Sequence, residues 1–115
     1  MKILITSAFL IAFLASCSLT STTLIKPNDS FILGKNAHGR FSVKLKNLSE
    51  NDLTIWKVPM DGGQHSPTKV QPNETLKVKV ERNTGLKIEN NNEAEANVFL
   101  VVKGDTGLSM GYQNK

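Results

Sequence analysis

The segment Arg40-Phe41-Ser42-Val43-Lys44-Leu45-Lys46 decides the fold class of this 115-residue chain. Its apolar residues alternate with polar and basic residues at a period of two. This alternation is typical of a strand that has one face in a core and the other face in water. The same pattern recurs over 76–81, 86–89, 94–102 and 108–112. The sequence therefore predicts a protein built from strands.

Turn-forming residues separate these alternating segments. Glycine, asparagine, aspartate or proline occurs at 36–39, 49–52, 61–63, 71–74, 83–85, 90–92 and 104–107, and these residues adopt the backbone conformations of tight turns. No stretch of helical apolar spacing follows residue 30. Roughly seven short strands at spacings of about 8–12 residues predict an all-β domain, an antiparallel β-sandwich over residues 30–115. Antiparallel pairing is expected because the connections are too short for crossover helices.

Two segments between the expected strands carry a diffuse resemblance to known modules. Asn47-Leu48-Ser49 and Gln71-Pro72-Asn73-Glu74-Thr75 are similar to elements of immunoglobulin-like and fibronectin-like domains. The resemblance implies an immunoglobulin-like strand arrangement and no functional residue. The chain has a single cysteine, so no disulfide links the expected sheets.

The N-terminus has the layout of a secretion signal. Lys2 precedes an apolar run from Ile3 to Leu14, which is shorter than the ~20 residues that a membrane-spanning helix needs. Leu14-Ala15-Ser16-Cys17 resembles the lipobox of bacterial lipoproteins. The resemblance implies a signal peptide over 1–16, cleavage before Cys17, and acylation of that cysteine. An ordinary signal peptide and an N-terminal strand with a buried cysteine are the alternatives.

The same resemblance implies a location. In that family an aspartate directly after the lipidated cysteine favours the inner membrane of many Gram-negative bacteria, whereas this chain has Ser18. No acidic cluster follows Cys17 of the kind that directs some lipoproteins to the cell exterior. We therefore expect attachment to the outer membrane, facing the periplasm. The expected partners are the membrane, through acylated Cys17, and an envelope protein or glycan.

Residues 17–29 contain mainly serine, threonine and asparagine, together with Pro27. This composition predicts a lipidated Cys17 followed by a flexible Ser/Thr-rich tether. The alternative is a first strand from Thr22 to Lys26, since β-branched residues favour strands.

Two aromatic residues are candidates for a binding surface. In Leu53–Val58 the residues Leu53 and Ile55 occupy one face, while Trp56 and Val58 occupy the other. Phe99 likewise lies opposite the apolar face of its own segment. In one interpretation Trp56 and Phe99 stack on a sugar, peptide or partner. In the other, these strands are covered on both faces or Trp56 caps the open end of the sandwich.

The mature chain is basic by about three charges, and lysine pairs such as Lys44/Lys46 and Lys77/Lys79 are spread along strand faces. These lysines either attract an anionic envelope polymer or lipid phosphate, or keep the strands soluble and unassociated. Nucleic-acid binding is not expected, because no recognised motif is present and aromatic residues are few.

Few residues of the chain could act in catalysis or bind a metal ion. The histidines lie in predicted loops, Cys17 is consumed by acylation, and no serine has the Gly-x-Ser-x-Gly context. Copper ligands are available, but their spacing is loose and the thiolate of a blue-copper site is missing; they are Met60, His65, His38 and Met110. We therefore expect no enzyme, no metal and no cofactor. The sequence predicts a lipid-anchored structural or accessory interaction module; the alternative is a periplasmic ligand-binding or inhibitor module that uses Trp56 and adjacent loops.

Overall fold

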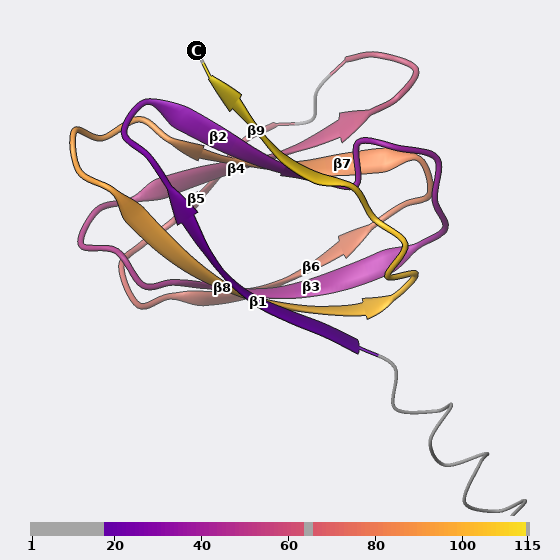
Figure 1. Cartoon of the computed structure of the whole chain (residues 1–115), viewed down its shortest axis with the longest axis horizontal. Coiled ribbons are helices and arrows are strands. Elements are labelled where there is room, and N and C mark those ends of the chain that lie inside the picture. The colour runs from indigo at the N-terminus through magenta and orange to yellow at the C-terminus, as the bar shows by residue number, and fades with distance from the viewer. Residues whose placement is uncertain (1–17, 64–65, 115) are drawn as a thin grey trace, which may run out of the picture.

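The computed structural model of the chain describes residues 18–63 and 66–114. These residues form nine strands in two antiparallel sheets, and no helix occurs among them (Figure 1). The strands are β1 (Ser18–Ile25), β2 (Asp29–Leu33), β3 (Phe41–Asn47), β4 (Leu53–Pro59), β5 (Thr68–Val70), β6 (Thr75–Val80), β7 (Thr84–Asn90), β8 (Ala96–Gly104) and β9 (Met110–Asn114). The predicted all-β sandwich is confirmed, with two more strands than the sequence suggested. In this part of the chain no helix is long and apolar enough to cross a membrane.

The strand order is that of a jelly roll. One sheet has the order β1-β8-β3-β6 and the other has the order β5-β4-β7-β2-β9. The first eight strands pair as nested partners, namely β1 with β8, β2 with β7, β3 with β6 and β4 with β5. This long double ribbon rolls up, so that β8 also pairs with β3 and β7 with β4. The order thus differs from that of an immunoglobulin domain, in which the first two strands share one sheet.

The core lies between the two sheets and consists of the inward residues of each strand. In the four-stranded sheet Val43 faces Val102 and Leu45 faces Leu100 across the β3–β8 ladder, and all four side chains are buried. The predicted inward and outward faces of these strands are confirmed, because side chains alternate strictly along a strand.

The predicted tether is wrong from Ser18 onward. Residues 18–25 form β1, which pairs with β8 from Ser18 opposite Lys103 to Ile25 opposite Ala96. The Ile25 side chain is fully buried, and the threonines of this segment fit the pleated surface of a strand. The sandwich therefore already includes Ser18, while Cys17 and the predicted signal peptide lie outside the described residues.

Candidate binding groove

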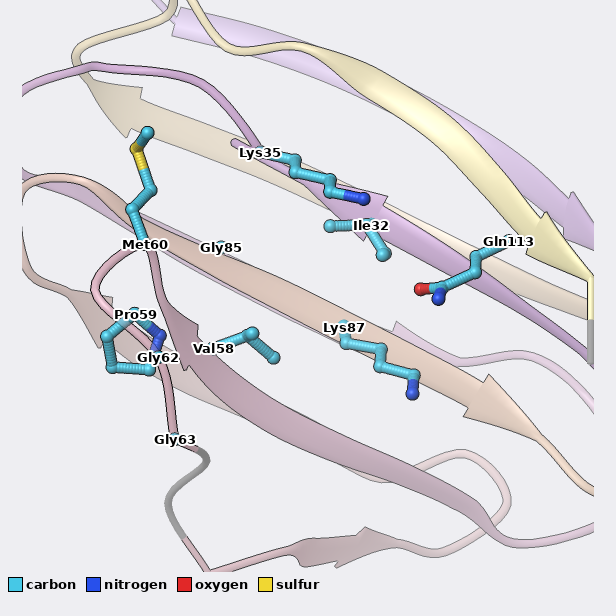
Figure 2. A pocket seen from close by; sticks show the side chains of 10 residues that line it. All are labelled: Ile32, Lys35, Val58, Pro59, Met60, Gly62, Gly63, Gly85, Lys87 and Gln113. Carbon is cyan, nitrogen blue, oxygen red and sulfur yellow. The ribbon is translucent and has the colours of Figure 1, made fainter.

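The outer face of the five-stranded sheet carries an open groove with a volume of about 540 Å³ (Figure 2). The central strands β2, β4 and β7 supply its floor and the loops after β2 and β4 supply one end. Its apolar lining is Ile32, Val58, Pro59 and Met60, and its polar side chains are Lys35, Lys87 and Gln113. The groove is thus a mainly apolar surface with a few polar groups, as is usual for a ligand site.

A glycine keeps the floor of the groove open. Gly85 lies opposite Val58 in the β4–β7 ladder. A Cβ atom built on Gly85 would lie 3.4 Å from Cγ2 of Ile32, so a larger side chain would occupy the space between these neighbours. The missing side chain at residue 85 leaves this part of the floor open.

The polar groups of the groove differ in how they are paired. The Lys87 ammonium lies 3.6 Å from Oε2 of Glu89, whose side chain is largely buried. Lys35 forms no salt bridge among the described residues. Figure 2 shows Lys35 and Gln113 extending towards Ile32 from its two sides. A ligand here would meet an apolar floor flanked by an amine and an amide.

Trp56 lies on the same outer face but does not line this groove. It is the cross-strand partner of Lys87, and its indole N–H donates to Oε1 of Glu89 at 3.4 Å. The side chain is half-buried and lies outside the core cluster. The sequence left open whether Trp56 is covered or exposed, and the structure places it half-buried on the outer face; its binding role remains a prediction.

Phe99 lies on the other side of the molecule. It belongs to the outer face of the four-stranded sheet, where Lys46 and Thr22 are its cross-strand partners. The two sheets lie between Phe99 and Trp56, so the two aromatic residues do not form one site. Cys17, the predicted lipidation site, lies outside the described residues.

The sequence reasoning missed the contribution of β2. Ser30 and Ile32 point outward and are nevertheless buried. Ser30 lies between Glu89 and Gln113, and its hydroxyl has no hydrogen-bond partner among the described residues. The consecutive apolar residues Phe31, Ile32 and Leu33 were an available signal, because such a run indicates a strand covered on both faces.

The His38 side chain makes structural hydrogen bonds. Its Nδ1 lies 2.6 Å from the Gly39 carbonyl oxygen and its Nε2 lies 2.9 Å from the Thr84 carbonyl oxygen. The neighbouring Asp105 carboxylate accepts hydrogen bonds from the backbone N–H groups of Gly39 and Gly107. These two donors, and to a lesser degree the charge of His38, hold the pKa of Asp105 below its usual value. Asp105 therefore stays ionised as it joins the loops that follow β2 and β8.

The other copper ligands that the sequence offered are not assembled with His38 in the described structure. Met60 and Met110 are exposed, and His65 lies outside the described residues. Within 18–63 and 66–114, no group of His, Cys, Asp and Glu side chains is arranged to hold a metal ion.

No protein-family model matches the chain, and a search of curated proteins gives no match. Among solved structures, the crystal structure of the Yersinia pseudotuberculosis-derived mitogen is similar. The likeness has a TM-score of 0.52 and 19% sequence identity, and it covers 81% of this chain and 94% of the mitogen chain. At this identity the likeness concerns the fold alone.

Proposed function

We propose that this chain is a lipid-anchored, non-catalytic interaction module of the bacterial envelope. Its anchor is the acylated Cys17, in the outer membrane and facing the periplasm, and the lipobox resemblance supports this assignment. The observation that carries the binding role is the groove on the outer face of the five-stranded sheet. The mitogen contributes a fold likeness, and no activity is transferred from it.

The chemistry of the groove favours a segment of an envelope protein. An apolar side chain of the partner that packs on Ile32 and Val58 removes apolar surface from water. This burial stabilises the complex by about 25 cal/mol per Å² of apolar surface. A neighbouring carboxylate of the partner pairs with Lys35, and a backbone group hydrogen-bonds to Gln113. β2 and β7 are paired on both sides, whereas β4 pairs with β5 only over Leu53–Ile55. Recognition on the floor of the groove therefore uses side chains.

Filling the groove should remove this interaction. We expect Gly85→Val to reduce partner cross-linking at least about tenfold, because its methyl groups occupy the space beside Ile32. The measurement is in-cell photo-cross-linking in the native host, with the photoreactive residue at Val58 of the full-length protein. Gly85 is buried, and a Cβ atom there would already contact Ile32 and the Leu33 and Gly34 carbonyl oxygens. We therefore expect Gly85→Val to lower the free energy of unfolding by about 1–3 kcal/mol, and urea denaturation checks that the variant used for cross-linking is folded.

The matched control is Thr22→Val, which places the same side chain on the outer face of the opposite sheet. Cross-linking from Val58 should survive in this control. Adducts that persist in Gly85→Val, or that form equally well from position 22, would contradict the assignment of the groove.

A glycan or peptide ligand on Trp56 is the second candidate, and the half-buried indole beside Lys87 favours it. Trp56→Ala separates the candidates in the same cells. Adducts that disappear with Trp56→Ala and persist with Gly85→Val assign binding to the tryptophan instead of the groove.

A further inference from the structure

The charged residues that point outward from the strands of the four-stranded sheet are all lysines. Five lysines point outward from β3, β6 and β8, and we call this surface the lysine face; they are Lys44, Lys46, Lys77, Lys79 and Lys103. The other outward residues of these strands and of β1 are uncharged. Glu81, which directly follows β6, lies at one end of this face near Lys79 and Lys103, and its carboxylate is 3.7 Å from the Lys57 ammonium. Within the strands themselves, no described acidic side chain points outward from this sheet.

The positions of these lysines on neighbouring strands lower the stability of the fold. Lys44 and Lys77 are direct cross-strand partners, and like charges in this arrangement are destabilising. The salt bridges of the described residues involve Lys57 and Lys87, so none of the five lysines is neutralised by one. An anionic surface placed against this face would relieve the repulsion.

The proposed anchor lies beside the lysine face. β1 is an edge strand of the same sheet, and its first residue, Ser18, is the cross-strand partner of Lys103. Cys17 directly precedes Ser18, and consecutive Cα atoms are about 3.8 Å apart. Acyl chains on Cys17 would therefore hold this face close to the lipid headgroups, with no tether between.

We infer that the lysine face docks on anionic phospholipid headgroups next to the anchor. The inference rests on the proposed acylation of Cys17. The groove, which lies on the opposite sheet, then faces away from the membrane towards the periplasm. A lysine near an anionic membrane strengthens binding about fivefold, and the anchor makes each contact intramolecular.

A fluorescent label tests the docked orientation in the acylated protein. Because acylation consumes Cys17, an introduced cysteine at Ser42 is the only free thiol, and an environment-sensitive probe attached there lies on the lysine face. In vesicles of phosphatidylcholine mixed equally with phosphatidylglycerol, the probe should be shielded by headgroups. A probe at Thr54, on the opposite sheet, should stay exposed to water.

Variants that lack lysine charges test whether the lysine face is responsible for docking. The double variant Lys44→Gln/Lys77→Gln should lower the ratio of docked to undocked protein about thirtyfold, and it removes a repulsion, so it should not unfold the sheet. The matched control Lys69→Gln/Arg82→Gln removes the same charge from β5 of the other sheet and from the β6–β7 loop beside Pro59 and Met60, and it should leave docking unchanged.

Different results would contradict the proposed anchor and the proposed docking of the lysine face. Protein that lacks acyl groups would not enter the vesicles, which contradicts the anchor and with it the basis of the docking. Acylated protein whose Ser42 and Thr54 probes are equally exposed, or whose Ser42 probe is shielded equally in pure phosphatidylcholine, would overturn the lysine face alone.

Discussion

Asn90→Ala is expected to lower the free energy of unfolding by about 3 kcal/mol. Asn90 ends β7 and its side chain is fully buried. Its amide nitrogen donates to the carbonyl oxygens of Ile25 at 3.1 Å, Lys26 at 3.2 Å and Ala94 at 2.9 Å. Alanine would remove this donor from the Ile25 and Ala94 carbonyls, whereas the Lys26 carbonyl keeps the Asp29 N–H. A buried unsatisfied polar group costs about 1–3 kcal/mol.

Urea denaturation measures this loss, and Asn97→Ala is the matched control. Asn97 points outward from β8 and is exposed, so its truncation should change stability by less than about 0.5 kcal/mol. Equal losses in the two variants would mean that Asn90 does not join the β1–β2 turn to the β7–β8 loop.

Gly104→Ala should have an effect of similar size, a loss of about 2–4 kcal/mol. Gly104 ends β8 with a φ of 102°, a conformation that residues with a side chain rarely adopt. A Cβ atom there would lie 2.8 Å from the Arg40 carbonyl oxygen and 3.1 Å from Cα of Phe41. Both contacts are with backbone, so β3 and β8 would have to separate.

Gly111→Ala is the control for this prediction, again measured by urea denaturation. A Cβ atom on Gly111 meets nothing within 4 Å, and its φ is not positive. This variant should be neutral or slightly stabilised, because alanine restricts the unfolded chain. Wild-type stability of Gly104→Ala would contradict the close approach of β3 and β8.

The sequence was sufficient to assign strand faces but not strand order. The alternation around Val43 and Leu45 is local, and it correctly placed lysines outward and aliphatic side chains in the core. The pairing of β3 with both β6 and β8 is non-local, and the same alternation would suit many strand orders. Alternation alone therefore could not separate a jelly roll from an immunoglobulin-like arrangement.

Neither β1 nor the groove could be predicted from the sequence, for different reasons. β1 is an edge strand whose outward residues Thr20 and Thr22 are polar, so its composition resembled that of a tether. The groove brings together Ile32, Val58 and Gly85 from separate strands, and only the fold makes them neighbours. The sequence placed Trp56 and Phe99 opposite the apolar faces of their segments, but it could not reveal whether they are covered or that they belong to opposite sheets.

Acylation of Cys17 is the central claim, because both the envelope location and the docking of the lysine face depend on it. The most direct test is the intact mass of the mature protein purified from its native host, together with membrane fractionation, for wild type and Cys17→Ala. We predict a wild-type mass that lacks residues 1–16 and includes acyl groups, recovered with the outer membrane, with both properties lost in Cys17→Ala. A wild-type protein with an unmodified Cys17 thiol would contradict the account.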